Sequence, residues 1–414
     1  MAGKKKLLVV VGAGASVEFG MPSVTQVGAL LSQGSLGHFA LDADPARGVY
    51  DWLTEAVEAY WKRHIKPGLL KTPSFEDILY LLFQLGTLFP NGARTSPIGA
   101  FADPVAFPVI RGLGGTKLLD QDDLRQLGSA LTDILITHFR GLCRGLDPAK
   151  TPQVDLMRSL FAALSADHDV AVVTLNYDDV IWRCLPTLET GFAADGTFEA
   201  GRLLNRTDWP CFLHLHGSVH FDMAGRGGDL HAITWQDDLN APFQQNAAGR
   251  NGVQTTEGLI FPQSAIVAGY GKTQQILRRP FRTYYSELDR LVDQSDALLC
   301  LGYGFADDHL NAALEGYRDR RRRKVALIDF AQDGETSAAG ARFDPERALN
   351  TAMMTFRNDA NAMSALGYTA PMDVRDLKAA QAFDQSIDPD TPLAVWYGGM
   401  LQACRHSGEI LKHL

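Results

Sequence analysis

Glycines and small polar side chains follow directly after several short apolar runs in this chain, and open sheet proteins bind ligands at such positions. The first case is the stretch 12–16, Gly-Ala-Gly-Ala-Ser, which follows a run of leucine and valine. Glycines there let backbone N–H groups approach a pyrophosphate, and a following helix adds positive potential. Val17 stands where the dehydrogenase fingerprint has glycine or alanine, and the acidic residue expected about 20 positions further on is missing. The stretch indicates either a nucleotide phosphate site or a tight turn between strand and helix.

A second group of polar residues is the stretch 174–178, Thr-Leu-Asn-Tyr-Asp, at the end of another apolar run. The amide of Asn176 and the carboxylate of Asp178 are suited to hold a water, a ribose hydroxyl or a carboxamide at the carboxyl edge of a sheet. The alternative is that Asp178 or Asp179 caps a following helix.

A third group, in 212–218, puts two histidines on one face of an expected strand, because His214 and His216 are two residues apart. A metal pair would need further ligands, and no carboxylate or cysteine stands at a familiar ligand spacing, so we expect no metal. An imidazole followed by Gly217 at a strand end suits a general base. The alternative for His216 is a hydrogen-bonded core histidine, and His214 is expected to be structural.

The stretch 302–308, Gly-Tyr-Gly-Phe-Ala-Asp-Asp, again follows an apolar run and is able to wrap the second half of a dinucleotide. Asp329 ends the next apolar run and is placed like a carboxylate that binds an adenosine ribose. Both features are also explained as a turn and a cap.

Five short apolar runs are expected to be the strands that position these groups: 6–11, 169–175, 212–215, 297–302 and 325–330. Their near-continuous Val, Leu, Ile and Ala content is typical of strands buried on both faces of a parallel sheet. Helical patterns over 152–166, 282–294 and 307–318 alternate with them. We therefore predict an α/β fold with a Rossmann-like, doubly wound parallel sheet.

The first two strands are about 150 residues apart, too far for one crossover connection. We expect a mostly helical insertion over roughly 25–160, with helices at 49–62, 74–85 and 118–142 and a loop-rich stretch at 90–115. A second irregular stretch, 224–258, is expected to be a long surface loop or a lid. The catalytic domain would cover 1–335, and a helical C-terminal region, 336–414, would pack on it or on a partner.

Composition excludes several classes of protein. The chain has 414 residues, 46% of them hydrophobic, and its formal net charge of −9 argues against coating of nucleic acid. The basic run 318–324 is explained as the solvated end of a helix, with a nucleic-acid or partner contact as the alternative.

No apolar run is long enough to cross a bilayer, and the five scattered cysteines indicate a reduced, cytoplasmic protein. The apolar run 7–11 is too short for a secretory signal and fits a buried first strand.

Taken in order, these motifs resemble the signature of the sirtuin superfamily: Gly-Ala-Gly-x-Ser-x-x-x-Gly-x-Pro over 12–22, Thr-x-Asn-x-Asp over 174–178, and His-Gly at 216–217. The stretch 302–309, Gly-Tyr-Gly-Phe-x-Asp-Asp-His, is similar to the form found in bacterial sirtuin-like, NAD-consuming defence proteins. The resemblance covers roughly residues 5–330, without the insertion. It departs from protein deacylases at 23–25, where Ser-Val-Thr replaces Asp-Phe-Arg, and in lacking the four-cysteine zinc module.

The resemblance implies NAD as substrate, no metal, and cleavage of the nicotinamide–ribose bond. Asn176 would position a water or ribose hydroxyl, Asp178 would hold the carboxamide end, and His216 would act on the ribose hydroxyl or attacking water. The other site residues implied are Gly12, Ala13, Gly14 and Ser16 for the diphosphate, Gly302, Gly304 and Asp329 for the adenosine side, and Pro22, Thr174 and Gly217 beside them.

The expected function is therefore that of an NAD⁺ glycohydrolase, acting as an anti-phage defence effector within a complex. The resemblance implies a homo-oligomer with a second defence protein, such as a HerA-type ATPase/helicase or an Argonaute-like subunit. Nucleic acid would be reached only through that partner, and no membrane contact is expected. The alternatives are an NAD-dependent protein lysine deacylase and a non-catalytic nucleotide-binding regulatory subunit, and the choice between hydrolysis and cyclisation of NAD stays open.

Overall fold

The computed structural model describes most of the chain, and the following account is limited to those residues. They are 3–64, 73–88, 107–112, 114–146, 152–223, 232–246, 254–255, 258–259, 264–269, 275–317, 323–330, 374–385 and 392–414. Most of the expected loop-rich stretch 90–115, about half of the stretch 224–258, five residues of the basic run 318–324, and the part of the C-terminal region before 374 lie outside them. The described part of 224–258 is not all surface loop, because it includes a short buried strand at Thr234–Trp235.

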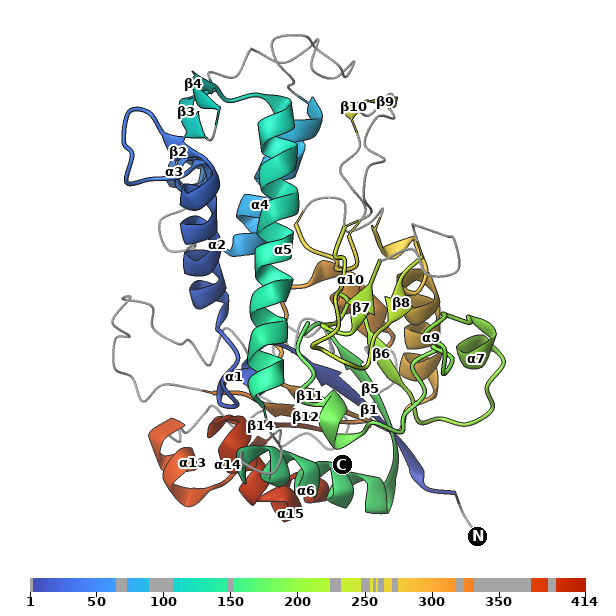
Figure 1. Cartoon of the computed structure of the whole chain (residues 1–414). Helices are drawn as coiled ribbons and strands as arrows, with labels where there is room; N and C mark the ends of the chain where they lie inside the picture. The colour runs from blue at the N-terminus through green and yellow to red at the C-terminus, as the bar shows by residue number, and fades with distance from the viewer. Residues whose placement is uncertain are drawn as a thin grey trace. The chain divides into compact units, whose positions relative to one another are not determined.

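A seven-stranded sheet organises the first of two units, which comprises Met1–Met21, Gly145–Leu215 and Pro280–Leu414. Its strand order is β13-β14-β12-β11-β1-β5-β6, and every pair is parallel except β13 with β14 (Figure 1). The strands are β1 (Lys5–Val11), β5 (His168–Thr174), β6 (Phe212–His214), β11 (Ala297–Leu301), β12 (Lys324–Ile328), β13 (Asp384–Gln385) and β14 (Leu393–Trp396). The predicted doubly wound α/β sheet is confirmed.

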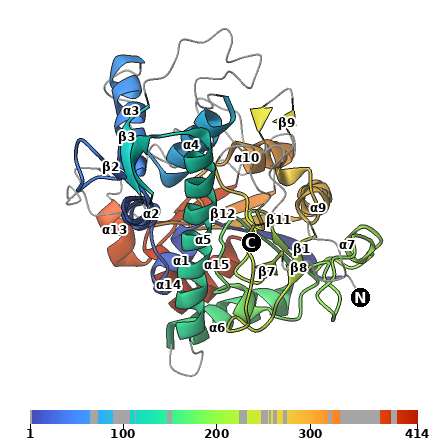
Figure 2. The ribbon, with the colours of Figure 1, turned by 45° about the horizontal axis from the view of Figure 1, so that its top comes forward.

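Helices cover both faces of this sheet. α6 (Pro152–Asp167), α14 (Gly399–Arg405) and α15 (Ser407–Lys412) pack together on one face (Figure 1). α9 (Phe281–Gln294) and α10 (Asp308–Leu314) pack together on the other, and Figure 2 again shows α6 and α9 on opposite sides of β1. Because both faces are covered, the middle strands are apolar throughout: every residue of β11 is buried, as are the last five of β1.

The order in which the chain adds strands to the sheet reverses between β1 and β11. From β1 the chain adds β5 and then β6 on one side, and β11, β12 and β14 on the other. The crevice at the carboxyl ends of such a pair of strands is where open α/β sheets bind ligands. Both strands end in the glycine-containing stretches singled out above, 12–16 and 302–308.

The stretch after β1 does not lead into a long helix. α1 spans only Gly14–Val17, and the next helix of the chain, α2 (Val24–His38), begins seven residues later. Gly20 adopts a positive φ of 92°, and Pro22 follows it. Both features end helices, so the expected contribution of a helix dipole at this turn is limited to a single helical turn.

The C-terminal region holds strands as well as helices. α13 (Val374–Ala380), α14 and α15 are helical, whereas β14 pairs in parallel with β12 and adds to the edge of the sheet. The run Leu-Ala-Val-Trp of β14 is fully buried. The tail is therefore part of the sheet unit rather than a separate helical layer.

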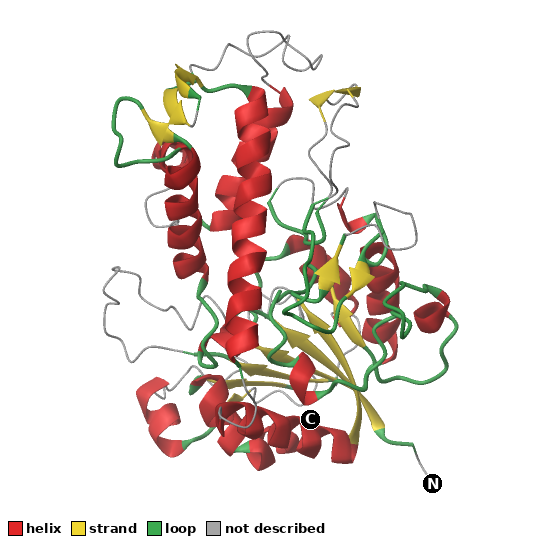
Figure 3. Cartoon of the chain, viewed as in Figure 1, coloured by secondary structure: helices red, strands yellow, loops and turns green. Residues whose placement is uncertain are grey.

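The second unit comprises Pro22–Arg144 and His216–Arg279. Its helices α3 (Val49–His64), α4 (Phe75–Leu88) and α5 (Gln121–Gly145) match the three expected helices of the insertion, and α2 is a further helix that was not predicted (Figure 3). Its short strands are β2 (Ala40–Leu41), β3 (Val109–Gly112), β4 (Gly115–Leu118), β7 (Phe221–Asp222), β8 (Thr234–Trp235), β9 (Gln254–Thr255) and β10 (Gly258–Leu259). α6, which the approximate bounds of the insertion overlap, packs on the sheet, as expected for a helix that alternates with the strands.

Within the described residues, no helix combines the length and the apolar character that crossing a membrane requires.

Candidate functional site

Backbone contact between the turns after β1 and β11 explains their glycines. A Cβ atom on Gly12 would lie 2.6 Å from the carbonyl oxygen of Gly302, and one on Gly302 would lie 2.1 Å from the backbone nitrogen of Ala15. Gly302 also has a φ of +55°, in the left-handed region that favours glycine. Only residues without side chains let these two turns approach so closely. Gly304 differs, because a Cβ there would meet nothing within 4 Å.

Most N–H groups of the turn 12–16 already have partners. Gly12 donates to the carbonyl of Leu301 at 2.9 Å and Gly14 donates to that of Gly302 at 3.0 Å. The N–H groups of residues 15 and 16 donate to the carbonyls of residues 12 and 13. Among the described residues, none accepts from the N–H of Ala13, which is exposed. In this arrangement Ala13 is the residue of the turn whose N–H is open to a phosphate oxygen.

Asn176 is fixed by hydrogen bonds to the turn after β1. Its Nδ2 donates to the carbonyl oxygen of Gly12 at 3.0 Å and to Ser16 Oγ at 3.1 Å. Its backbone N–H donates to Thr174 Oγ1 at 3.0 Å. Because both protons of the amide nitrogen are used, the amide orientation is set. None of the described residues donates to Asn176 Oδ1, so this oxygen is the atom with capacity for a substrate hydroxyl or a water.

Asp178 completes the same network. Ser16 Oγ donates to Asp178 Oδ1 at 3.0 Å, and the N–H of Val180 donates to the same oxygen at 3.0 Å. Burial raises the pKa of Asp178 to about 6, since loss of water disfavours the charged form more than these donors favour it. Asp178 does not cap an α-helix: the next helical element is a 3₁₀ turn at Trp182–Cys184.

His216 lies in the second unit, where backbone contacts fix its segment. Its carbonyl accepts from the N–H of Val267 at 2.8 Å, and its side chain is buried. Gly217 has a φ of +100°, and a Cβ there would lie 2.7 Å from the carbonyl oxygen of Ala265. The glycine beside the histidine thus serves a close backbone approach. Pro22 also belongs to this unit and directly precedes Ser23, the N-cap of α2.

The residues just before His216 are held beside β5 by strand pairing at the end of β6. Thr174 is in register with His214, and the N–H of Leu215 donates to the carbonyl of Thr174 at 2.9 Å. His214 is fully buried, with ring contacts to Phe212 at 4.8 Å between centroids. These surroundings suit the structural role expected for His214.

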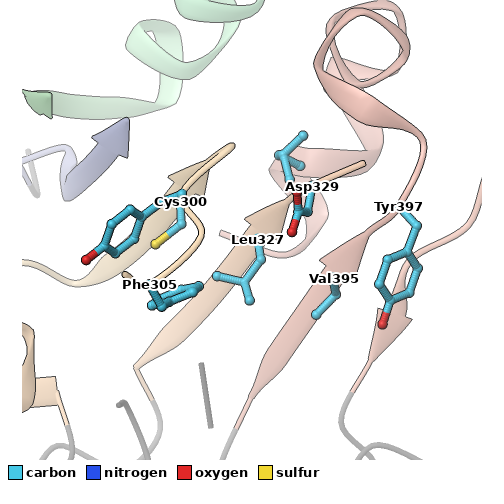
Figure 4. A pocket seen from close by; sticks show the side chains of 8 residues that line it. Cys300, Phe305, Leu327, Asp329, Val395 and Tyr397 are labelled. Atoms are coloured by element: carbon cyan, nitrogen blue, oxygen red, sulfur yellow. The ribbon is translucent and has the colours of Figure 1, made fainter. Parts of the chain in front are cut away.

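A pocket lies at the carboxyl ends of β11, β12 and β14 (Figure 4). Its floor is a row of three residues in register across the strands, Cys300, Leu327 and Val395. Its space is about 310 Å³, including the part open to solvent. The remaining lining residues are Tyr303, Phe305, Ile328, Asp329 and Tyr397.

Asp329 enters this pocket with a fixed backbone. Its N–H donates to the carbonyl of Trp396 at 2.8 Å, its carbonyl accepts from the N–H of Gly399 at 3.0 Å, and its Oδ1 accepts from the N–H of Phe330 at 2.8 Å. Burial raises the pKa of Asp329 to about 6.

Aromatic side chains form the pocket wall, and polar contacts hold them. Phe305 has a φ of +54°, an unfavourable conformation for a bulky residue. The side chain of Asn311 donates to the carbonyl of Phe305 at 2.9 Å and accepts from Tyr303 Oη at 2.7 Å. Asp307 caps α10 by accepting from the N–H of Leu310 at 2.9 Å. The cap and the asparagine therefore hold the strained turn in place.

The structure thus brings together the predicted residues Ser16, Asn176 and Asp178, and it places the predicted Asp329 in a pocket. Ser16, Asn176 and Asp178 form one hydrogen-bonded network with Gly12 and Thr174. Gly302 touches that turn, while Asp329 lies in the pocket. Sequence reasoning named Phe305 only as part of the stretch 302–308 and did not single out Tyr397. A signal for Tyr397 existed, because 393–399 repeats the pattern of a buried apolar run followed by glycine.

Among the described residues, no group of three or more His, Cys, Asp or Glu side chains is placed to hold a metal ion.

Comparison with known proteins identifies one domain. The model of the SIR2-like domain matches residues 170–350. The comparison with curated proteins finds none that matches. A solved SIR2 homolog in complex with NAD is 11% identical, with a TM-score of 0.34, over 99% of this chain and 91% of the other. Sir2Tm bound to a propionylated peptide is 13% identical, with a TM-score of 0.29, over 85% and 92%.

A mutant Sir2 homologue in complex with ADP ribose is 12% identical, with a TM-score of 0.31, over 85% of this chain and 91% of the other. At such TM-scores no position of those structures is transferred to this chain. Residues 170–350 of the chain match the SIR2-like domain model, which is what the chain is shown to resemble.

Proposed function

We propose that this protein is an NAD⁺ glycohydrolase that cleaves the bond between nicotinamide and ribose. The observation that carries the proposal is the network of Ser16, Asn176 and Asp178 at the carboxyl ends of β1 and β5, in a chain with a SIR2-like domain. Two of the similar structures contain NAD or ADP ribose. NAD carries ribose hydroxyls, which are able to donate to the Asn176 Oδ1 of this network.

The reaction breaks the bond between ribose C1′ and the nicotinamide nitrogen, and the bond's electron pair leaves with neutral nicotinamide. Positive charge develops on the ribose, as in other glycoside hydrolyses. Asn176 Oδ1, set by the two donor contacts of its amide nitrogen, accepts from a ribose hydroxyl or from the attacking water. Asp178 holds Ser16 and, through it, the orientation of that amide. It contributes negative potential when ionised.

His216 is the proposed base. Water adds its oxygen to C1′, and the proton that it loses passes to the imidazole and then to solvent, so that nicotinamide, ADP ribose and a proton are the products. The support is its position in the chain, directly after Leu215, which donates to the carbonyl of Thr174. An imidazole exchanges protons near neutral pH without extreme tuning.

The remaining predicted residues would bind the rest of the substrate. The turn of Gly12, Ala13 and Gly14 faces the diphosphate, with the N–H of Ala13 as donor. Gly302 and Gly304 line the path toward adenosine, and Asp329 binds the adenosine ribose in the pocket.

Hydrolysis of NAD is favoured over deacylation of lysine by two features of the sequence. Ser-Val-Thr at 23–25 replaces the Asp-Phe-Arg of deacylases, and the five cysteines include no C-x-x-C pair for the zinc module of that group. In the structure Ser23 instead caps α2, in a reciprocal pair of contacts with Gln26.

The biological part of the proposal is depletion of NAD during phage infection, in a homo-oligomer activated by a second defence protein. That protein would be a HerA-type ATPase/helicase or an Argonaute-like subunit, and any nucleic acid would be sensed by it. The support is the sequence resemblance of 302–309 to bacterial NAD-consuming defence proteins.

The test is product identification after incubation of NAD with purified protein, alone and with the protein encoded beside it. We expect nicotinamide and ADP ribose in equal amounts, whereas a cyclic product would correct the proposal to cyclisation. Asn176→Ala and His216→Ala should each slow release by at least about 100-fold, the usual scale for such groups. Asn205→Ala and His38→Ala, exposed positions away from these groups, are matched controls.

Full turnover by either site variant excludes its assigned role. Turnover that needs an acetylated peptide would make the protein a deacylase. A complex that binds NAD without consuming it would make the chain a regulatory subunit.

A further inference from the structure

A second buried carboxylate directly follows Asp178. Asp179 is 2% exposed, and its Oδ2 forms an ion pair with Arg183 Nη2 at 2.9 Å. A charge inside a protein is costly unless a partner compensates it, and a guanidinium at this distance supplies such compensation. The reaction scheme gives a task to Asp178 and none to Asp179. The chain thus keeps another buried charge beside the network of Ser16, Asn176 and Asp178, together with a cation that compensates it.

The turn that carries Arg183 is anchored at three points. The N–H of Arg183 donates to the carbonyl of Asp179 at 2.9 Å, so main chain and side chain join the same two residues. Its Nη1 donates to the carbonyl of Leu146 at 2.6 Å. The neighbouring Trp182 packs edge-on against Phe212 of β6, at 5.4 Å between ring centroids. Because the planar fork of an arginine serves two acceptors at once, it holds the Asp179 carboxylate in one place.

The charge of Asp179 acts on Asp178. Burial is the first cause of the raised pKa of Asp178, and the negative charge of Asp179 adds to it. Two uncharged donors also contact this carboxyl, the hydroxyl of Ser16 on the turn after β1 and the N–H of Val180, and both lower its pKa. The cation of Arg183, bound to Asp179, offsets part of the repulsion between the two carboxylates. This arrangement lets both be charged at the same time.

We propose that Asp179 and Arg183 are a positioning pair, which holds the segment of Asp178 in place and sets the pH at which Asp178 becomes charged. The inference rests on the proposed function, because Asp178 is taken to orient Ser16 and Asn176 for the cleavage of NAD. Neither member of the pair needs to touch the substrate, since both act through Asp178. A pair with a purely structural role would contribute stability and leave the ionisation of Asp178 unchanged.

The experiment follows the ionisation of Asp178 through the stability of the full chain, so it does not depend on activity. The free energy of unfolding is measured from about pH 4 to about pH 8 for each protein and for the same protein with Asp178→Asn. The difference between the two isolates Asp178, and it levels off above the pH at which Asp178 has lost its proton. In the unaltered protein we expect the difference to level off above a pH of about 6.

Asp179→Asn should move the pH at which the difference levels off downward by at least about one unit, because it removes the negative charge next to Asp178 and leaves the cation. Arg183→Gln should move this pH upward by about half a unit or more, because two carboxylates then share a site with less positive charge. The double variant should return close to the unaltered protein. The acid limb of the pH profile of nicotinamide release should also move to lower pH in Asp179→Asn.

The matched control is the pair of Asp155 and Arg158 on α6, which has the same two residue types at exposed positions. Asp155→Asn and Arg158→Gln should leave the ionisation of Asp178 unchanged. If Asp179→Asn causes no shift, or only a loss of stability that is equal at every pH, the inference is overturned while the proposed function stands. If no protein releases nicotinamide, the proposed function is overturned, and the shifts in unfolding still decide the electrostatic role of the pair. Asp179→Asn decides the question even if Arg183→Gln fails to fold.

Discussion

Two buried carboxylates at the same edge of the sheet differ in what surrounds them. Burial raises the pKa of both Asp178 and Asp329 to about 6. Asp178 accepts from Ser16 and Val180 inside a closed network, whereas Asp329 accepts from one backbone N–H and lines an open pocket. The difference teaches that carboxylates with similarly raised pKa values can stand in different surroundings. Asp178 is held inside a network of protein donors, whereas Asp329 faces a pocket.

The largest expected effect concerns Gly302, which lies between the two regions. Gly302→Ala should destabilise the protein by at least about 3 kcal/mol, because its Cβ would lie 2.1 Å from a backbone nitrogen at a φ of +55°. Denaturant unfolding measures this loss. Gly304→Ala, with open space around the new methyl group, should change stability by about 0.5 kcal/mol or less. Equal losses in the two variants would contradict the close contact of the turns.

Asp178→Asn should stabilise the protein at high pH. The folded pKa of Asp178, about 6, is above the unfolded value of about 3.9, so the folded state binds the extra proton between them. The stability that this carboxyl contributes is present below pH ~4 and is lost as pH rises through 6. Asparagine does not ionise, so the variant should be more stable than the unaltered protein by up to about 3 kcal/mol at pH 8.

Asp178→Asn and the unaltered protein should have equal free energies of unfolding near pH 4. Unfolding curves of both proteins at pH 4 and pH 8 would check this. A variant that is less stable at pH 8 than at pH 4, as the unaltered protein is, would show that another group carries the pH dependence. Loss of nicotinamide release alongside the gain in stability would fit a group kept for function.

Ser16→Ala should cost about 1–3 kcal/mol, because it removes a hydroxyl that joins Asn176 to Asp178 inside the protein. The hydroxyl also favours the charged carboxylate, so the pKa of Asp178 should rise further and the loss should be larger at pH 8 than at pH 5. Ser286→Ala on α9 is the control, since its hydroxyl donates to a carbonyl of its own helix at an exposed site. A loss that is the same at both pH values would break the link between Ser16 and the carboxylate.

The smallest effect should come from Glu18, which connects the segment after α1 with α14 in the C-terminal region. Its Oε2 accepts from the N–H of Leu401 at 2.8 Å, at the start of α14. Glu18→Ala should lower stability by about 1 kcal/mol, as expected for a helix-terminal contact. Glu409→Ala, which breaks an exposed pair with Lys412, should change it by less than about 0.5 kcal/mol. If both variants behave alike in thermal unfolding, the tail is not anchored through Glu18.

Strands that are buried on both faces were predictable from sequence, because their apolar runs end within one or two residues of β1, β5, β6, β11 and β12. β14 escaped although its run is of the same kind. It is four residues long and follows a long stretch without such signals. Its place in the sheet is fixed by pairing with β12, and pairing partners far apart in sequence leave no local pattern.

The candidate site was predictable as a set of positions but not as a set of contacts. Asn176 and Asp178 stood out by residue type at a strand end. Their partner Ser16 is 160 and 162 positions away, and only the parallel pairing of β1 with β5 brings the three together. Phe305 was named only as part of the stretch 302–308, and Tyr397 was missed, since aromatic residues near glycines are also common in cores.

The most direct measurement of the central claim is a crystal structure of the full chain with ADP ribose bound. Our account places the adenosine ribose within hydrogen-bond distance of Asp329 and the distal ribose at Asn176 Oδ1. Adenosine bound anywhere else, or a distal ribose that makes no contact with Asn176, would contradict it.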